Sequence, residues 1–484
     1  MRSPLFLFIP TGIIASFIGY FGPSEQPNLT ATSNFTETVL NANGAEVYAQ
    51  FCASCHGADG RDFIQRSWKL GSRAEDLKRV IANGSSLLGM PAYDEVLSQD
   101  DIQDVSDYLL EKAAEAPSFF AAPPKIVRTT DINLRANIII DGLDTPWGMD
   151  FLNDTVLIFT EREGRLWAFH SGIQQEILGL PRDIHVKGQG GLLDVMLWTD
   201  PASDEDWLYL TYSKDYPTDK KLSATAAVRS QLKQSAQGFT IGEWEEILVA
   251  GPYSRTHHHY GSRMAMGADN MLYITCGERG MRDVHPQNLS TSPGKVHRLH
   301  PNGAVPEDNP FVNVDGAVPS IWSWGHRNPQ GMFIHPTTNE VWTHEHGPKG
   351  GDEINVLTKG ANYGWPEITF GRNYTGTIIT RDTAKTGMEQ PLHYWLPSIG
   401  ACGMDVIQGA SWPKSWQNNL LVGSLSFEYL ERVVLDASGK VSAREKLLDG
   451  IGRVRDIARS DDGTIYVAVE GAGMIFQLEP IVED

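Results

Sequence analysis

Residues 264–274, Met-Ala-Met-Gly-Ala-Asp-Asn-Met-Leu-Tyr-Ile, carry the pattern that decides the fold of this chain. A short apolar strand is followed by a polar turn and then by a second strand of large apolar residues. Short apolar runs that are bounded by Gly, Asp and Asn turns are typical of antiparallel strands. The same pattern returns along the chain, and its copies start at Met149, Val195, Met264, Met332, Met404 and Asp456.

Six copies of this unit predict a β-propeller. One copy cannot bury the face of its own sheet, so neighbouring copies must stack around a common axis. A two-sheet β-sandwich is the alternative, but a region of roughly 350 residues is too long for a single sandwich. We therefore expect a mainly β protein with a six-bladed propeller over residues 130–482.

The composition supports a folded protein and restricts its partners. The chain has 484 residues, of which 41% are hydrophobic and 21% are charged, so it can bury a large core. There are 60 acidic and 40 basic residues, and the net charge of −20 argues against nucleic acid or an anionic membrane as the main partner. Four cysteines are too few for a disulfide scaffold.

The N-terminus, residues 1–22, is predicted to be an export segment. Arg2 is followed by a run without charged residues from Leu5 to Phe21, which is typical of a secretory signal peptide or a membrane anchor. A membrane span needs roughly 20 apolar residues, so both cleavage and retention remain open. In either case we expect the rest of the chain outside the cytoplasm, in the periplasm or exported.

Residues 52–56, Cys-Ala-Ser-Cys-His, match the motif for covalent attachment of a c-type haem. Cys52 and Cys55 would bond to the haem vinyl groups, and His56 would bind the iron. A redox dithiol or half of a zinc site is the alternative, but the motif has neither a βαβ context nor a second Cys/His pair nearby. Met90 lies in a Gly-Met-Pro segment and is the candidate sixth ligand, because His/Met ligation is typical of electron-transfer haems.

Residues 41–115 resemble a class I cytochrome c domain, which is small and all-α. We expect one helix over residues 44–51 and another after Ser98, whose buried face would hold Ile102, Val105 and Leu109. A haem with two axial ligands does not bind substrate, so the resemblance implies electron transfer. A Pro/Ala-rich linker over residues 113–124 separates this domain from the propeller.

Polar clusters lie at the ends of the predicted propeller strands. Corresponding strand ends share one face of the ring, so we expect the clusters to form one axial pocket with arginines, histidine and carboxylates. Several fixed cations favour an anionic ligand, although each cluster alone could be a structural ion pair. The clusters are residues 188–194, 257–263, 324–331, 344–353 and 453–456.

The motifs GQGGLL, HxGSR, GHRNPQG, EHGPKGGDE, NYGWP and RVRD occur in this order. With them, residues 135–480 resemble the soluble pyrroloquinoline-quinone sugar dehydrogenases, that is, the glucose/sorbosone dehydrogenase family and its aldose sugar dehydrogenase branch. The resemblance implies that the propeller binds the quinone over its axis. It also implies that an aldose sugar is oxidised at the anomeric carbon to a lactone by hydride transfer to the quinone.

The resemblance further implies roles for single residues. His259 would be the general base, Glu278 would support it, and Arg327 would stabilise developing charge. The quinone or substrate would contact Gln189, Asn328, Ser398, Arg453 and Arg455. A calcium ion on the quinone would bind the backbone carbonyls of Gly347 and Pro348, and a second, structural calcium would bind Glu353 and the Tyr363 backbone. The c-type haem would pass the electrons to an external acceptor, either a cytochrome or the respiratory chain.

Two departures keep other interpretations open. Ser426 stands where the family often has a cofactor-binding lysine, so the propeller could be a non-catalytic module that binds a glycan or protein beside an electron-carrier cytochrome. A respiratory reductase with a second haem in the propeller is disfavoured, because it would need about eight blades. Cys276 and Cys402 could form a disulfide or remain two buried thiols.

Overall fold

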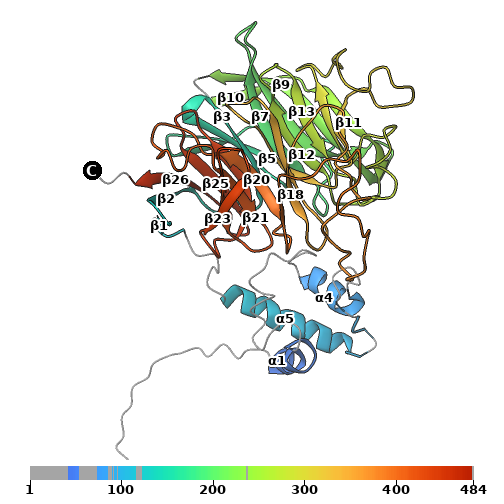
Figure 1. The fold of residues 1–484 in the computed structure, drawn as a ribbon. Helices are drawn as coiled ribbons and strands as arrows, with labels where there is room; N and C mark the ends of the chain where they lie inside the picture. The colour runs from blue at the N-terminus through green and yellow to red at the C-terminus, as the bar shows by residue number, and fades with distance from the viewer. Residues whose placement is uncertain are drawn as a thin grey trace, which may run out of the picture.

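The structure is a computed structural model that describes residues 42–53, 74–84, 90, 92–94, 96–115, 123–235 and 238–481. In these ranges the α-helices precede residue 116 and the strands follow residue 125 (Figure 1). The export segment at residues 1–22 and the haem-motif residues Cys55 and His56 lie outside the described residues. None of the described helices is long and apolar enough to span a bilayer.

The described helices surround one small core. Helix α1 (Ala42–Val47) continues into a π-helical turn, η1 (Tyr48–Cys52), as expected for residues 44–51. Helix α4 (Ala74–Asn83) and helix α5 (Gln99–Glu115) complete the group. Ser98 caps α5 as predicted, because its hydroxyl accepts the backbone N–H of Asp101 at 3.1 Å. The core holds Val47, Tyr48, Ile81, Leu97, Ile102, Val105, Tyr108 and Leu109.

The described chain after residue 125 forms six antiparallel sheets, which we call blades 1 to 6. Blade 1 holds β3 (Pro146–Leu152), β4 (Val156–Glu161), β5 (Arg165–His170) and β6 (Ile173–Glu176). Blade 2 holds β7 (Leu192–Thr199), β8 (Asp206–Tyr216), β9 (Asp219–Ser235), β10 (Gly238–Ile241) and β11 (Glu245–Ser254). Blade 3 holds β12 (Gly261–Met266), β13 (Leu272–Cys276), β14 (Lys295–Leu299) and β15 (Ile321–Trp324).

The remaining blades follow the same plan. Blade 4 holds β16 (Pro329–Ile334), β17 (Val341–Glu345), β18 (Asp352–Val356) and β19 (His393–Trp395). Blade 5 holds β20 (Ala401–Val406), β21 (Leu420–Ser424), β22 (Leu430–Leu435) and β23 (Val441–Leu447). Blade 6 holds β24 (Arg453–Arg459), β25 (Ile465–Glu470), β26 (Met474–Ile481), β2 (Asn133–Ile140) and β1 (Ile126–Arg128). A short 3-10 turn, η3 (Asn153–Thr155), lies in blade 1.

The two ends of the strand region close the ring. Strand β2 pairs with β26, from Asn133 opposite Ile481 to Ile140 opposite Ile475, and Figure 1 shows the early β2 beside the late β26. Blade 6 therefore combines residues from both ends of the propeller, and the hydrogen bonds between β2 and β26 join these two ends. Strand β1 begins at Ile126, slightly before the expected boundary at residue 130.

The six predicted strand pairs are confirmed as the first two strands of the six blades. Side chains alternate between the two faces of a strand, so alternate residues of each strand pack against different neighbouring blades. Leu272 and Ile274 of β13 pack in the core between blades 2 and 3, whereas Tyr273 packs between blades 3 and 4. Each blade thus shares one apolar core with the blade before it and another with the blade after it. The fold is a six-bladed β-propeller.

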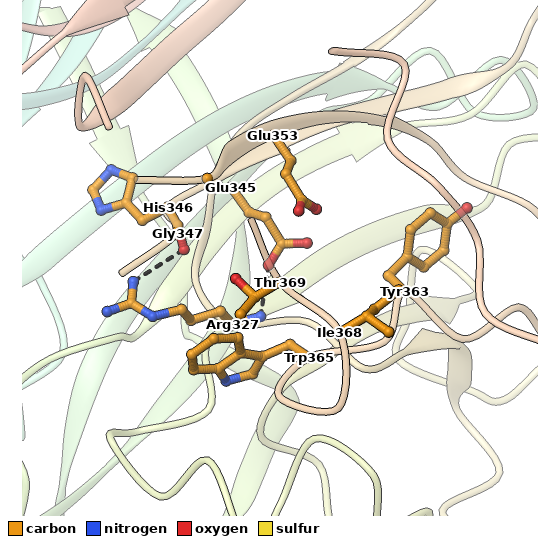
Figure 2. A pocket seen from close by; sticks show the side chains of 10 residues that line it. Arg327, Glu345, His346, Gly347, Glu353, Tyr363, Trp365, Ile368 and Thr369 are labelled. Atoms are coloured by element: carbon orange, nitrogen blue, oxygen red, sulfur yellow. Dashed lines mark hydrogen bonds between the residues drawn. The ribbon is translucent and has the colours of Figure 1, made fainter. Parts of the chain in front are cut away.

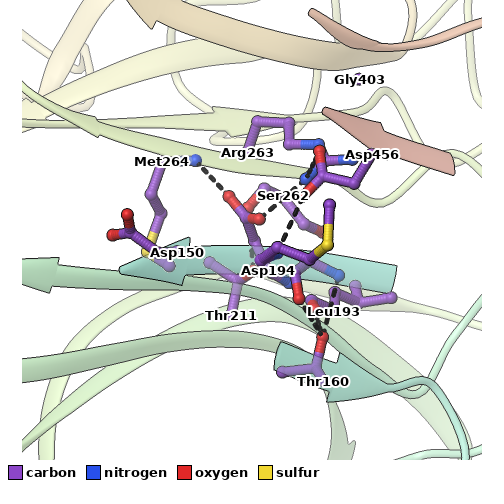
Figure 3. Close-up of polar contacts among 12 residues, drawn as sticks. Asp150, Thr160, Leu193, Asp194, Thr211, Ser262, Arg263, Met264, Gly403 and Asp456 are labelled. Carbon is purple, nitrogen blue, oxygen red and sulfur yellow. Dashed lines mark hydrogen bonds and ion pairs between the residues drawn. The ribbon is translucent and has the colours of Figure 1, made fainter. Parts of the chain in front are cut away.

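A bulge at one equivalent place shapes every innermost strand. The register shifts once between each of β3, β7, β12, β16, β20 and β24 and its partner strand. Threonines satisfy backbone groups there: the Thr211 hydroxyl accepts the N–H of Asp194 in its own blade and donates to Ser262 O in the next, at 3.0 and 2.8 Å (Figure 3). Thr160 forms the same link from blade 1 to blade 2.

Arg263 of β12 joins several blades near the ring axis. Its Nη1 lies 2.8 Å from Asp194 of blade 2 and 2.8 Å from Asp456 of blade 6 (Figure 3). Its Nε donates to Gln330 O of blade 4 at 2.9 Å, and its guanidinium lies 4.3 Å from the Trp147 ring of blade 1. This buried cation of blade 3 therefore contacts blades 1, 2, 4 and 6.

Candidate active site

The predicted site residues stand at equivalent ends of the innermost strands. Gln189 precedes β7, His259 precedes β12, Arg327 and Asn328 precede β16, and Arg453 opens β24. The backbone N–H of His259 donates to Gln189 Oε1 at 2.8 Å, which links the loops of blades 2 and 3. Asn328 Oδ1 accepts a backbone N–H from the start of β12 at 3.0 Å, which links blades 3 and 4. The blade ends therefore converge as the propeller geometry requires.

His259 and Glu278 form a hydrogen-bonded dyad. His259 Nδ1 lies 2.8 Å from Glu278 Oε1, and the Glu278 side chain is only 1% exposed. Burial and the nearby cation of Arg327 hold the pKa of His259 well below its usual value. Burial raises the pKa of Glu278, and Arg327 opposes this shift. The imidazole is therefore neutral near pH 7, and its Nε2 is the ring atom left free to accept a proton.

Arg327 lies on the same side of the ring as the dyad. The N–H of Glu278 donates to Arg327 O at 2.9 Å, so both residues belong to one site. The Arg327 guanidinium donates to His346 O at 3.0 Å and lies 5.4 Å from the Trp365 ring. Its own backbone N–H donates to Glu345 at 2.6 Å. Among the described residues no carboxylate forms an ion pair with this guanidinium, so its charge can act on a ligand.

Arg453 and Arg455 share one buried acid, Glu470. Arg455 Nε donates to Glu470 Oε2 at 3.0 Å, and Arg453 Nε lies 3.6 Å from the other carboxylate oxygen. Burial disfavours the charge on Glu470, but Arg455 and Arg453 hold its pKa far below the usual range. Arg455 also donates to Cys402 Sγ at 3.5 Å. Arg453 is the less buried arginine, so it is the better placed to meet a ligand.

The predicted calcium-binding carbonyls lie in a tightly held turn. The N–H of Gly347 donates to Asp352 Oδ1 at 2.8 Å, and Asp352 Oδ2 accepts the N–H groups of residues 400–401 at 2.6 and 3.1 Å. The Ser398 hydroxyl donates to Pro348 O at 3.0 Å. The structure thus brings Ser398 to this turn, and its contact with the quinone stays a prediction.

A pocket opens beside Arg327 and contains two carboxyl groups. Figure 2 shows Glu345 and Glu353 directing their carboxyl groups into the same space. Burial and the neighbouring Glu345 raise the pKa of Glu353 well above its usual value. Asn355 Oδ1, which is buried nearby, has no hydrogen-bond partner among the described atoms. The lining residues are Arg327, Glu345, His346, Gly347, Gly351, Glu353, Tyr363, Trp365, Ile368 and Thr369.

Three residues of the site had no predicted role. Glu345 and His346 lie in the EHGPKGGDE motif, so their position was noted but their contacts were not. Glu470 has no signal in the sequence, because its role depends on strand register: it pairs with Arg453 across β24 and β25. Knowledge of that register would have been enough to find it.

Two of the residues predicted to hold the haem, Cys52 and Met90, lie among the described residues. Cys52 ends η1 and is partly exposed, and Met90 packs against the helical core. The Tyr93 hydroxyl donates to Phe51 O at 3.1 Å, so the Met90 segment is tied to the helix that carries Cys52. Cys55 and His56 lie outside the described residues, so their roles stay predictions.

Cys276 and Cys402 are two separate buried thiols rather than a disulfide. The Cys402 thiol donates to Arg455 O at 3.0 Å. Burial raises the pKa of Cys276 to about 12. Ser426 takes part in backbone pairing, with its N–H donating to Ile399 O at 2.9 Å.

Comparison with known proteins agrees with this geometry. Residues 143–477 match the glucose/sorbosone dehydrogenase family, and residues 40–109 match the cbb3-type cytochrome c oxidase subunit III family. The chain is 35% identical over 375 residues to an aldose sugar dehydrogenase of Escherichia coli, an alignment that covers 75% of this chain and 98% of the relative. The propeller is thus that of a sugar dehydrogenase. The chain belongs to the glucose/sorbosone dehydrogenase family and carries a cytochrome c domain before it.

Solved structures give the same result. The apo form of the soluble aldose sugar dehydrogenase from Escherichia coli aligns with a TM-score of 0.67 at 32% identity, covering 72% of this chain and all of that one. The PQQ-bound form of an aldose sugar dehydrogenase from Streptomyces coelicolor aligns with a TM-score of 0.58 at 25% identity, covering 74% of this chain and all of that one.

Proposed function

We propose that this protein oxidises aldose sugars at the anomeric carbon to lactones, with pyrroloquinoline quinone as the hydride acceptor. The electrons then pass to the c-type haem of the same chain and on to an external acceptor. The observation that carries this proposal is the hydrogen-bonded pair of neutral His259 and Glu278, which lies beside Arg327, whose guanidinium has no carboxylate partner among the described residues. Removal of a hydroxyl proton requires a base that accepts the proton, and a nearby cation stabilises the negative charge left on the oxygen.

The residues at the axis fit a flat anion with several carboxylates. Arg327 has no acidic partner among the described residues, and Arg453 keeps one guanidinium nitrogen 2.9 Å from a backbone carbonyl rather than from an acid. These two arginines, with Gln189 and Asn328, would hold the quinone. The charge of Arg455 is neutralised by Glu470, so we assign Arg455 the task of supporting Arg453 through that acid.

The oxygen-rich turn and pocket fit calcium, which prefers oxygen ligands. The carbonyls of Gly347 and Pro348 would hold the ion on the quinone. Glu353 and the backbone of Tyr363 would hold a structural ion, because Glu345 and Glu353 direct two carboxyl groups into the same pocket. A bound calcium would act as a Lewis acid on the quinone.

The chain's own residues supply binding and proton transfer. Glu278 accepts the Nδ1–H of His259 and so presents the lone pair of Nε2 to the substrate. Nε2 takes the proton of the anomeric hydroxyl as the hydride leaves the same carbon. Arg327 stabilises negative charge on the oxygen that has lost its proton. The quinone, when bound, supplies the two-electron acceptor that no side chain can provide.

The haem domain gives this reaction its electron outlet. A c-type haem accepts one electron at a time, so two successive transfers would empty the reduced cofactor. The N-terminal export segment and the covalent haem motif together support a periplasmic or exported protein, with a possible membrane anchor at residues 1–22. The preferred sugar would be set by insertion loops such as residues 372–392.

The test is reconstitution of the full chain with pyrroloquinoline quinone and Ca²⁺, followed by a panel of aldoses. Sugar oxidation is followed with an artificial electron acceptor and, separately, through the absorption of the haem. His259→Ala should abolish both signals and leave reduction of the haem by dithionite intact. Sugar-dependent turnover at the parental rate in His259→Ala would reject the base assignment.

The same experiment tests the non-catalytic alternative that the Ser426 departure favours. A binding module would take up no quinone and reduce no acceptor, although sugar could still bind. Quinone uptake is measured by its absorbance after gel filtration, so loss of cofactor binding is distinguished from loss of catalysis.

A further inference from the structure

A chain of three side chains lies beside the site: Asp215 in β8, His185 in the loop before β7, and His257 in the loop before β12. His185 is buried, and its Nδ1 lies 2.7 Å from Asp215 Oδ1. Its Nε2 lies 3.2 Å from His257 Nδ1. Lys220 pairs with the other oxygen of Asp215 at 2.8 Å, which keeps that carboxylate charged. The proposed reaction uses none of these residues.

The three groups hold one another in place. The Asp215 carboxylate can only accept, so His185 must carry a proton on Nδ1. His185 Nε2 and His257 Nδ1 share the second hydrogen bond. Both imidazoles are thereby held in one orientation. The backbone of His185 is also fixed, because its N–H donates to Ser213 O at 2.7 Å and its O accepts the Ser213 hydroxyl at 2.7 Å.

This chain is connected to His259 through two further hydrogen bonds. His257 O accepts the N–H of Gln189 at 2.8 Å, and Gln189 Oε1 accepts the N–H of His259 at 2.8 Å. The contact between the two loops leaves no space for a side chain, because a Cβ on Gly188 would lie 2.4 Å from His257 O. The loop of blade 2 therefore holds the loop of blade 3 at both His257 and His259.

His259 needs such support because of its backbone. Its φ of +56° lies in the left-handed region, which residues other than glycine rarely adopt. The inner side of the same loop is held by Arg279, which donates to His258 O at 2.6 Å and to Thr256 O at 2.5 Å. The loop is thus fixed from blade 3 by Arg279 and from blade 2 by His185.

We propose that His185 is a positioning residue for the base His259, acting through His257 and Gln189. This inference rests on the proposed function, because it assigns the chain Asp215–His185–His257 the task of keeping Nε2 of His259 aimed at the substrate. Loss of His185 frees His257, lets the loop open and admits water to His259.

The variants are His185→Ala, His257→Ala and the conservative His257→Asn, whose Nδ2 can donate from nearly the position of the imidazole Nδ1. His170→Ala is the matched control, because His170 is an exposed histidine in blade 1 that bonds only locally, to Thr155 O and Ser171 Oγ. Each holoenzyme is assayed with an aldose and an artificial acceptor across pH.

We expect His185→Ala and His257→Ala to lower kcat by about tenfold to a hundredfold, as misplacement of a catalytic group does. The acid limb of their pH profiles should move to higher pH, because hydration returns the pKa of His259 towards its usual value. The double variant should be no worse than either single variant, and His257→Asn should restore most of the rate. Parental kcat and pH profile in His185→Ala would overturn the inference.

A second readout needs no sugar oxidation. Hydrogen exchange measured by mass spectrometry should be faster over residues 256–261 in His185→Ala and unchanged in His170→Ala. Unchanged exchange in that segment would also overturn the inference. If the parent protein oxidises no aldose while the exchange result holds, the proposed function fails and the positioning role of His185 stands.

Discussion

Glu278→Gln tests the central claim about the site. The substitution removes the charge of the carboxyl group that lies 2.8 Å from His259 Nδ1 but keeps an oxygen that can accept the same hydrogen. A hydrogen bond to a charged group contributes about 1.5–3 kcal/mol, and a neutral one about 0.5–1.5 kcal/mol. The midpoints of these ranges differ by about 1.25 kcal/mol, which applies to the imidazolium that forms during proton transfer and corresponds to a factor of roughly ten.

We therefore expect kcat of the reconstituted Glu278→Gln enzyme to fall about tenfold with an artificial acceptor. Folding stability should be unchanged or slightly higher, because burial disfavours the charge of Glu278 and neutral His259 leaves no unpaired cation. Turnover is measured with saturating sugar, and stability by thermal unfolding. Parental turnover together with a lower Tm would show that Glu278 serves only the fold and would refute the reasoning.

Three further predictions concern the ring, the haem domain and the pH profile. Arg263→Met should lower the free energy of unfolding by about 3–5 kcal/mol, because it leaves the buried Asp194 and Asp456 without their cation. The measurement is chemical unfolding, and an unchanged midpoint would contradict the role of Arg263 in joining the blades. Gly44→Ala should lower the thermal stability of the haem domain, followed by haem absorption, because its Cβ would lie 2.2 Å from Asp104 O; an unchanged transition would show that α1 and α5 can separate freely. Sugar oxidation should persist below pH 6.5 and fall only at more acidic pH, because the base works as the neutral imidazole and the pKa of His259 is lowered. The pH profile of kcat/KM tests this, and an acid limb above pH 6.5 would contradict it.

The repeated strand pairs could be recognised from the sequence because each is local. Two neighbouring strands and their turn lie within 16 residues in blade 1 (residues 146–161) and within 25 residues in blade 2 (residues 192–216), so apolar alternation and turn residues are enough to find them. The outer strands of blades 3 and 4 could not be placed, because long insertions separate β14, β15 and β19 from the strands before them. Closure of the ring by β2 was not expected either, since it joins residues from opposite ends of the propeller.

The candidate site residues divide in the same way. The sequence predicts that His259, Arg327 and the turn at Gly347 meet, because they stand in motifs at strand ends, which the propeller geometry brings together. The contact of Arg453 and Arg455 with Glu470 was not predicted, because it depends on one acid across the sheet.

By itself, the sequence determined the number of blades, the helical haem domain before them and the kinds of groups that meet at the axis, because these follow from periodicity and from motifs of neighbouring residues. Only the tertiary structure decided which cation stays free for a ligand, which histidine is kept neutral and which loop holds it. Charge pairing, desolvation and backbone conformation at the site depend on residues that are far apart along the chain and meet only in the closed ring.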